Sequence, residues 1–472
     1  MNSSSIHNVS RRVFLARAGA LGGMGLAAPM AMSLASAGEA AAFSASDYKA
    51  LVCIFLYGGN DCHNTLIPTD IPNYDRYSAI RGGASGRKRG GIAYGLDELV
   101  ALKPVVNQTL TDDLSYGLAP SLIKTAALFN SGKLAIQLNV GPLVVPVTRV
   151  QFQSGAVPLP PKLFSHNDQQ SVWQALGAEG ATVGWGGRIG DLALSSNTNS
   201  LLTCISASGN AVFLSGNDAL QYQISPGGAI PIWAAKGASF GSSRASEVLK
   251  TLITEPRAHV LENEFTKVTK RSMVMEDIVN TALNPITLTT SFDTDNKPNS
   301  LANQLKIVAR LIGARSALGS KRQVFFVSLG GFDTHDGLME THPNLLALID
   351  EALSSFYAAT VELGVENQVT TFTASDFGRT LTSNGDGSDH GWGGHHFVMG
   401  GAVKGGRYFG TAPQVSITSD DQVGQGRLLP STSVDQMAST LARWLGASES
   451  ELPTILPRIG NFSSSNLGYF ST

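Results

Sequence analysis

The sequence predicts an α/β fold: a doubly wound, mostly parallel sheet with helices on both faces. Four short, nearly continuous apolar runs are typical of strands covered on both sides, and they lie at residues 50–57, 134–140, 323–329 and 368–374. Helical segments at residues 120–131, 301–318 and 345–364 precede the last three of these runs. Strands that alternate with helices along a chain indicate a parallel sheet.

The rest of the chain is consistent with one large domain. Residues 142–163 form a Pro-rich loop, and a terminal helix is expected at residues 434–445. Residues 203–231 suggest short β pieces and residues 243–280 suggest helices, so we interpret the stretch 195–300 as an insertion covering one end of the sheet. No low-complexity linker or internal repeat divides residues 43–472, which we expect to form a single α/β domain.

The first 42 residues are typical of a twin-arginine signal peptide. Arg11 and Arg12 precede a stretch, Ala18 to Ala37, that contains no charged residue, and small-residue cleavage patterns end at Ala37 and at Ala42. We therefore predict cleavage near residue 37 or 42, export by the twin-arginine translocase, and no membrane span in the cleaved protein. The alternative is an uncleaved anchor, although four glycines and a proline weaken this run as a spanning helix.

Charge and cysteine content exclude several classes of partner. Up to Ala37 the signal carries three of the 34 basic residues and no acidic one, which leaves 34 − 3 = 31 against 36 acidic residues, a net charge of −5. The sequence contains no basic stripe of the kind that binds nucleic acid, and no polybasic run of the kind that binds a membrane surface. The three cysteines are too few for a disulfide scaffold.

Polar, glycine-rich motifs follow the predicted strands. In an open α/β sheet, ligands bind outside the carboxyl ends of the strands, so these motifs are expected to meet at one edge. Asp and His side chains that converge at one point suit Zn²⁺ or Mn²⁺. The glycine pairs allow sharp turns and close backbone approach. The motifs are Gly58-Gly59-Asn60-Asp61-Cys62-His63, Phe164-Ser165-His166-Asn167-Asp168, Gly330-Gly331-Phe332-Asp333-Thr334-His335, Ser375-Asp376-Phe377-Gly378-Arg379 and Asp389-His390-Gly391-Trp392-Gly393-Gly394-His395-His396.

The signal segment and the motifs at residues 58–61, 331–335, 375–380 and 389–391, the last running into residues 400–406, resemble an exported bacterial family of uncharacterised proteins within the alkaline-phosphatase/sulfatase superfamily. The resemblance covers nearly all of residues 47–472. It implies an alkaline-phosphatase-like fold that holds one or two divalent metal ions, Zn or Mn, beside a Ser or Thr nucleophile. The metal ligands it implies are Asp61, Asp333, His335, Asp376, His390 and His395, with His396 as an alternative to His395.

The motifs specify the nucleophile and the anion-binding residue less clearly than they specify the metal ligands. Ser165 is the candidate nucleophile, because it precedes an expected helix whose N-terminus favours a phosphoryl group; Thr65 is the alternative. Ser165 could instead act only as a helix cap. Arg379 is the candidate oxyanion-binding residue, with a surface ion pair as the other interpretation.

Two departures from the superfamily pattern bear on the second metal. Phe377 stands where the superfamily has a His directly after the late-strand Asp, and the spacing from Asp333 to His335 is shorter than usual. A formylglycine sulfatase needs a Cys or Ser followed by x-Pro-Ser-Arg, and Cys62 lacks that context.

The sequence therefore predicts a periplasmic or extracellular metal-dependent hydrolase of phosphate or sulfate esters, acting on a small-molecule or polymer substrate. The alternative is a non-catalytic, metal-containing export-assembly or surface-binding protein on the same fold. Phe377 and the uncertain nucleophile favour that alternative.

Overall fold

The computed structural model describes residues 45–239, 241–292 and 298–471. The chain divides into two units, Met1–Ser44 and Ala45–Thr472, and all described residues belong to the second. The predicted signal peptide at residues 1–42 lies outside the described residues. Within the described ranges, no helix is both long enough and apolar enough to cross a membrane.

A nine-stranded sheet forms the centre of Ala45–Thr472, with the order β11-β5-β10-β9-β1-β8-β6-β7 and β12 paired to β5. Every strand runs parallel to its neighbours except β10, which is antiparallel to both β5 and β9. The strands are β1 (Lys49–Tyr57), β5 (Leu134–Gly141), β6 (Cys204–Ser206), β7 (Gln221–Gln223), β8 (Arg322–Gly330), β9 (Val369–Ser375), β10 (Gly394–Met399), β11 (Tyr408–Phe409) and β12 (Thr432–Ser433).

The four apolar runs predicted as strands are β1, β5, β8 and β9. Their side chains are almost all buried, as expected for strands covered on both faces. Ala50 of β1 faces Gln323 of β8 and Val369 of β9, which makes β1 the central strand. The sequence did not predict β10, which separates β5 from β9.

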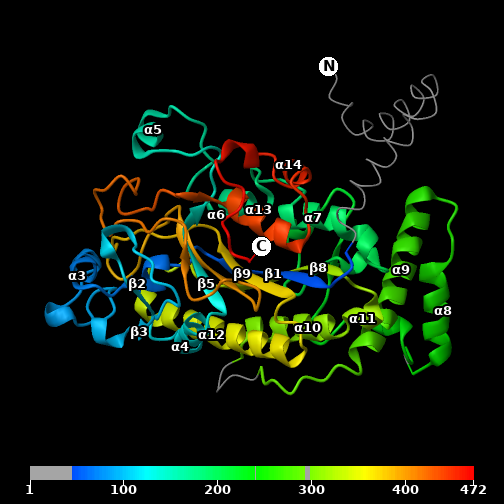
Figure 1. Ribbon diagram of the computed structural model, residues 1–472. Coiled ribbons are helices and arrows are strands. Elements are labelled where there is room, and N and C mark those ends of the chain that lie inside the picture. Colours follow the sequence, from blue (N-terminus) through cyan, green and yellow to red (C-terminus); the bar gives the residue numbers. More distant parts are fainter. Residues whose placement is uncertain (1–44, 240, 293–297, 472) are drawn as a thin grey trace, which may run out of the picture. The chain divides into compact units, whose positions relative to one another are not determined.

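Helices cover both faces of the sheet (Figure 1). In the orientation of Figure 1, α4 (Ile123–Asn130), α10 (Ser300–Gly313) and α12 (Leu338–Glu362) lie below the strands. Above them lie α6 (His166–Ala175), α7 (Trp185–Ala193) and α13 (Val434–Leu445). The predicted doubly wound, mostly parallel α/β fold is therefore confirmed. The smaller elements include α3 (Ile71–Ile80), α5 (Arg149–Ser154), α11 (Arg315–Leu318), α14 (Leu452–Ile455) and a second sheet of β2 (Leu66–Pro68), β4 (Tyr116–Leu118) and β3 (Val100–Ala101).

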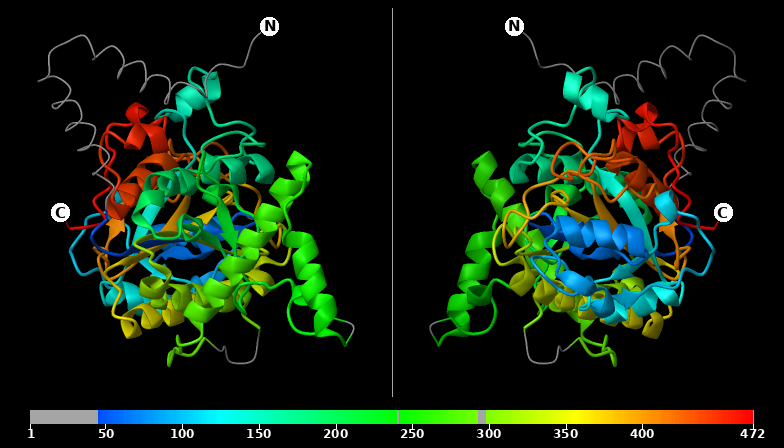
Figure 2. Two further views of the ribbon diagram at one scale, coloured as in Figure 1. Left: turned by 90° about the vertical axis from the view of Figure 1, so that its right-hand side faces the viewer. Right: turned by 90° about the vertical axis from the view of Figure 1, so that its left-hand side faces the viewer.

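Residues 195–300 extend one end of the sheet and then leave it. Strands β6 and β7 add to the sheet beside β8. Two helices follow, α8 (Ser243–Thr254) and α9 (Val260–Leu283), which stand side by side at the edge of the described part (Figures 1 and 2).

The topology brings the polar motifs to one edge. The loops after β1, β8 and β9 all leave the carboxyl ends of neighbouring parallel strands. Because β10 is antiparallel, the segment that precedes it reaches the same edge. Gly58 makes the close approach possible: its φ is +116°, and an added Cβ would lie 2.4 Å from the backbone nitrogen of Asp333.

Candidate metal centre

Three side chains from three separate segments meet at the carboxyl edge of the sheet. His166 begins α6, Asp333 follows β8, and His390 lies in the segment that leads into β10. One ligand atom from each lies within 4.8 Å of the others, and this is the group among the described residues that could hold a metal ion. An antiparallel backbone bridge between Arg379 and His390 ties the loop after β9 to the segment before β10.

His335 adjoins this group. Its Nε2 lies 2.8 Å from Nε2 of His390 and 3.2 Å from Oδ1 of Asp333. The same Asp333 oxygen is 3.2 Å from His390 Nε2, and Asp333 Oδ2 is 3.4 Å from His166 Nε2. Three imidazole nitrogens therefore surround one carboxylate.

The hydrogen-bond network assigns the tautomer of each ring. His390 Nδ1 is 2.7 Å from the carbonyl oxygen of Phe164, which can only accept a hydrogen bond. His166 Nδ1 is 2.6 Å from the Asp376 carboxylate, and His335 Nδ1 is 3.2 Å from that of Asp389. Each Nδ1 therefore carries a hydrogen, and in its neutral form each ring presents the lone pair of Nε2.

This arrangement is unsatisfied without a cation. In those tautomers, the facing Nε2 atoms of His335 and His390 have no hydrogen to share, and the Asp333 carboxylate can only accept. The Nε2 of His166 is buried and makes no hydrogen bond. The ligand atoms of His166, Asp333 and His390 thus lie close enough to share one cation, with His335 beside them, and this set fits a cation that accepts mixed imidazole and carboxylate ligands, such as Zn²⁺ or Mn²⁺. Histidine ligands in metal sites usually donate their other ring N–H to a carboxylate or carbonyl, as all three rings do here.

Arg379 orients the central carboxylate. Its guanidinium is fully buried and donates 3.0 Å hydrogen bonds to Oδ1 of Asp333 and to the carbonyl oxygen of Gly58. Burial raises the pKa of Asp333, but the hydrogen bond and charge of Arg379, together with the charges of His166 and His335, outweigh it and hold that pKa below its ordinary value. Asp333 is therefore ionised at neutral pH and 46% exposed, so it can accept a metal ion from solvent. Arg379 fixes the position of this carboxylate through its contact with Oδ1.

Asp376 orients His166. Its buried Oδ2 accepts hydrogen bonds from His166 Nδ1 at 2.6 Å, from Gln170 Nε2 at 2.8 Å and from the backbone nitrogen of Gly58 at 3.2 Å. The hydrogen bond to Asp376 raises the pKa of His166. Burial, in contrast, lowers the pKa of His390, which favours the neutral, metal-binding form of that ring.

Asp61 lies in a different environment. It is fully buried, its Oδ2 is 2.5 Å from Nη2 of Arg81, and the same oxygen accepts a 2.8 Å hydrogen bond from Ser388. Its Oδ1 accepts from the backbone nitrogen of Asn64 at 3.0 Å. Burial raises the pKa of Asp61, but the charge and hydrogen bond of Arg81, together with the charges of His63 and His342, outweigh it, and the pKa lies well below its ordinary value. Both oxygens are thus engaged within the protein.

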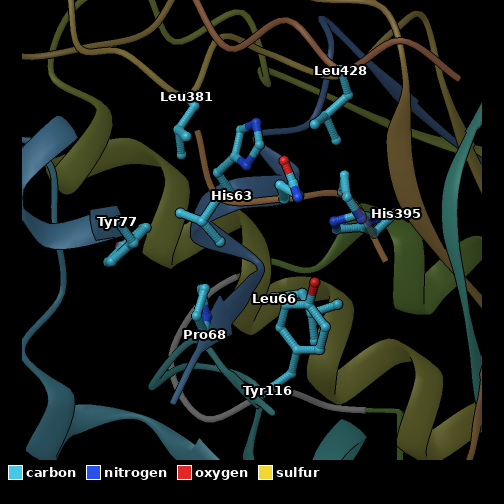
Figure 3. Close-up of a pocket in the computed structure, with 11 residues that line it drawn as sticks. His63, Leu66, Pro68, Tyr77, Tyr116, Leu381, His395 and Leu428 are labelled. Carbon is cyan, nitrogen blue, oxygen red and sulfur yellow. The ribbon is translucent and has the colours of Figure 1, made fainter. Parts of the chain in front are cut away.

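His395 faces a small separate cavity. Its Nδ1 accepts a 3.0 Å hydrogen bond from the backbone nitrogen of Asn139, and burial lowers its pKa to about 3. Figure 3 shows His395 and His63 at this cavity, whose volume of about 20 Å³ is close to that of one water molecule. His395 lies within β10 and is not part of the group of His166, Asp333 and His390.

Both candidate nucleophiles make internal hydrogen bonds. Ser165 is the residue before α6, and its hydroxyl donates to Oδ2 of Asp168 at 2.9 Å. The Thr65 hydroxyl is buried and donates to the carbonyl oxygen of Asp61 at 2.8 Å. Ser165 directly precedes His166 in the chain, so it lies nearer to the metal cluster in sequence.

Sequence reasoning did not select His166 as a metal ligand, although it lay in one of the motifs. The signal that could have identified it is its position at the start of a helix after a long loop from β5, since the helix N-terminus is directed at the sheet edge. Its partner Asp376 lies 210 residues away, so the pairing could not be read from local spacing.

The fold and the cluster together define a mixed α/β protein with a His/Asp group, at the carboxyl edge of its sheet, that could hold a divalent cation. The chain belongs to a family described as protein of unknown function (DUF1501), whose model matches residues 48–452. No curated protein matches the chain at a significant level.

Solved structures show low similarity over most of the chain. The C-terminal periplasmic domain of EcEptC from Escherichia coli, in complex with Zn, is 9% identical with a TM-score of 0.36, covering 91% of this chain and 89% of that one. The PsFucS1 sulfatase from Pseudoalteromonas sp. is 9% identical with a TM-score of 0.36, covering 91% and 74%. The lipoteichoic acid synthase LtaP from Listeria monocytogenes is 10% identical with a TM-score of 0.33, covering 86% and 74%. Similarities of this size assign no activity to the chain.

Proposed function

We propose that this protein is a metal-dependent hydrolase of phosphate or sulfate esters, with His166, Asp333 and His390 as ligands and His335 as a fourth candidate ligand. The observation that carries the proposal is the convergence of three imidazole Nε2 atoms on one ionised carboxylate, with every Nδ1 bound to an acceptor. The motif resemblance to the alkaline-phosphatase/sulfatase superfamily supports the ester class of substrate.

A bound Zn²⁺ or Mn²⁺ would supply Lewis-acid polarisation of an ester oxygen and would lower the pKa of a coordinated nucleophile. The chain's own residues hold the ligands: Asp376 fixes the ring of His166, and Arg379 fixes the carboxylate of Asp333. Ser165 is the proposed nucleophile, and its hydroxyl must leave Asp168 to act.

We further propose one metal ion rather than two. Asp61 is engaged with Arg81. Oδ2 of Asp376 accepts three hydrogen bonds from protein groups, which leaves Oδ1 as its one buried oxygen without a hydrogen-bond partner. The ring of Phe377 lies 4.8 Å from that of His166 and 4.6 Å from that of His390, measured between centroids. An apolar ring therefore packs against two of the proposed ligand rings, at the sequence position where the superfamily pattern has a His.

A non-catalytic, metal-containing protein is the second candidate. The observation that favours it is the engagement of both candidate hydroxyls, since Ser165 donates to Asp168 and Thr65 to the backbone of Asp61.

Metal analysis and an ester panel separate these two functions. Mature protein, analysed by plasma mass spectrometry, is expected to hold about one equivalent of Zn or Mn. We expect it to hydrolyse at least one of the aryl phosphate monoesters, phosphate diesters or aryl sulfates tested. Chelation is expected to abolish that turnover, and Zn²⁺ or Mn²⁺ to restore it. Retained metal without turnover on any ester would favour the non-catalytic protein, and absence of metal would contradict both.

Export through the twin-arginine translocase is proposed from the N-terminal sequence, and with it a periplasmic or extracellular location. Replacing Arg11 and Arg12 together by Lys is expected to retain the precursor in the cytoplasm, while Arg17→Lys is the matched control and should be exported normally. Immunoblots of periplasmic and cytoplasmic fractions measure the result. Equal export of the double variant and the control would rule out this route.

A further inference from the structure

Arg427 is a cation beside the metal centre. Its Nε donates a 2.7 Å hydrogen bond to the carbonyl oxygen of His390, one of the proposed ligands. Its guanidinium lies over the ring of Phe164, 5.2 Å from the ring centroid. Phe164 directly precedes Ser165, the proposed nucleophile. Arg427 therefore contacts both a ligand residue and the segment that carries the nucleophile.

The two outer nitrogens of Arg427 are free to bind a ligand. The side chain is half-buried, and its Nη1 and Nη2 make no hydrogen bond and no ion pair within 4.0 Å to any described residue. Neither atom is a buried group without a partner, so both reach solvent. Asp389 is near enough for its charge to act on the guanidinium, but it forms no ion pair with it. A guanidinium with free N–H groups can bind two oxygens of a phosphate or sulfate group in a planar fork.

Arg379, the oxyanion-binding candidate from the sequence, has no such free groups. It is fully buried, and each of its three nitrogens donates to the protein. Nε donates to the carbonyl oxygen of Ser388 at 3.0 Å, and Nη2 donates to the same oxygen. Nη1 donates to Oδ1 of Asp333 and to the carbonyl oxygen of Gly58, both at 3.0 Å. Arg379 thus serves the ligand Asp333 and leaves substrate binding to another residue.

The turn that carries Phe164 is strained. Its φ is +72° at Phe164 and +40° at Lys162, values that side chains other than glycine rarely adopt. Backbone strain of this kind clusters at functional sites. The carbonyl oxygen of Phe164 accepts the hydrogen bond from His390 Nδ1, while its ring supports Arg427. The turn therefore fixes a ligand ring and a guanidinium relative to each other.

The charge of the site calls for a further cation. The carboxylates of Asp333, Asp376 and Asp389 each lie within hydrogen-bond or ion-pair distance of a cluster histidine. Arg379 and one divalent ion would only balance these three negative charges. An anionic ester brings additional negative charge, and a positioned cation stabilises it most where water is partly excluded. Arg427 can supply that charge.

We propose that Arg427, rather than Arg379, binds the non-bridging oxygens of the phosphate or sulfate group of the substrate. This inference rests on the proposed hydrolysis of such esters and names the residue that recognises the anionic group they share. The Nε–H of Arg427 holds the guanidinium on His390, and the two Nη atoms bind the anion. The product anion carries the same oxygens, so Arg427 binds it as well.

Anion binding to the mature, metal-loaded protein tests this role without requiring turnover. Titration calorimetry with inorganic phosphate and, separately, with inorganic sulfate is expected to show that the natural sequence binds at least one of them. Arg427→Met should weaken that binding about 10–100-fold, because it removes charge-assisted hydrogen bonds. Arg427→Lys should weaken it less, since it keeps the charge but loses the planar fork.

Arg149→Met is the matched control. Arg149 is also half-buried, but it donates to the carbonyl oxygens of Thr418 and Ser419 rather than to a residue of the metal cluster. This variant should bind the anion as the natural sequence does. Metal affinity, measured by chelator competition, should not fall in Arg427→Met, because removal of a positive charge does not weaken a cation site.

Three results would overturn the anion-binding role. The first is equal anion affinity in the natural sequence and Arg427→Met, and the second is no binding of either anion by the natural sequence. The third is a parallel fall of metal affinity in Arg427→Met, which would show that Arg427 acts only by holding His390. Anion binding that depends on Arg427, without turnover of any ester, would support this inference and contradict hydrolysis. Turnover with an anion affinity independent of Arg427 would support hydrolysis and contradict this inference.

Discussion

Asp333→Ala is expected to leave the protein folded and to lower its affinity for the divalent metal by more than about 100-fold, because it removes the one carboxylate that three imidazole rings surround. The variant should also lose metal-dependent turnover. Asp333 is 46% exposed at the end of β8, so its removal opens no cavity in the core. Competition with a chromophoric chelator measures the affinity, and circular dichroism checks the fold.

Asp336→Ala is the matched control for this experiment. Asp336 is an exposed carboxylate three residues further along the same loop, and it lies outside the group of His166, Asp333 and His390. Its removal should change the metal affinity less than about 3-fold, since a surface charge at this distance is screened by solvent. Equal losses in the two variants would mean that general negative charge attracts the ion and that Asp333 is no ligand.

Asp376→Asn separates direct from indirect roles in the same site. The sequence resemblance predicts that Asp376 is a metal ligand, whereas in the structure its carboxylate is hydrogen-bonded to Nδ1 of His166. As an orienting partner its loss is expected to weaken metal affinity about 10–100-fold, less than the loss of Asp333. An Asp376→Asn variant that retains no metal at saturating concentrations would assign the carboxylate to the ion itself.

The fold was largely predictable because its central strands are long and continuously apolar. Apolar runs such as β1 and β8 indicate parallel strands that are covered on both sides. Helix α13 was expected over the same residues that it occupies in the structure. Strand β10 was missed because its two histidines were interpreted as part of a metal motif. Strands β6 and β7 lie within residues 203–231, where short β pieces were expected, but with three residues each they are too short for a period to give their bounds.

The candidate site was predictable as a place but only partly as a set of residues. Strand ends identify the edge of the sheet, and Asp333, His335 and His390 were selected from the motifs that reach it. Which carboxylate faces the ion depends on packing that local spacing does not reveal. Asp61 illustrates this: its partner Arg81 lies on the next segment of the chain and closes over the carboxylate inside the protein.

Asp61→Asn is expected to destabilise the protein by about 3–5 kcal/mol, because it leaves the buried guanidinium of Arg81 without its counter-charge. Both side chains are fully buried, and Arg81 also donates to the carbonyl oxygens of Thr380 and Leu381, so the charge cannot turn to solvent. Urea unfolding of the metal-free protein measures the loss. Asp75→Asn is the matched control, since Asp75 pairs with Arg87 on the surface and its loss should cost about 0–1 kcal/mol.

The same pair predicts a pH dependence of stability. The pKa of Asp61 is lowered in the folded protein from an ordinary value of 3.8. The unfolded chain therefore binds a proton at Asp61 more readily than the folded one. The contribution of Asp61 to stability is then fully present above about pH 4 and is lost as the pH falls below that value. Asp61→Asn should remove this part of the acid sensitivity.

Metal content decides between the two roles open to Asp61. If Asp61 acts through Arg81, the folded fraction of Asp61→Asn protein should bind the divalent ion within about 10-fold of the natural affinity, because the ligand group of His166, Asp333 and His390 remains intact. A stable Asp61→Asn protein that has lost its metal would instead make Asp61 a ligand, as the motif resemblance implies. Stability and metal affinity thus respond to different carboxylates, Asp61 and Asp333, that the sequence alone places in one class.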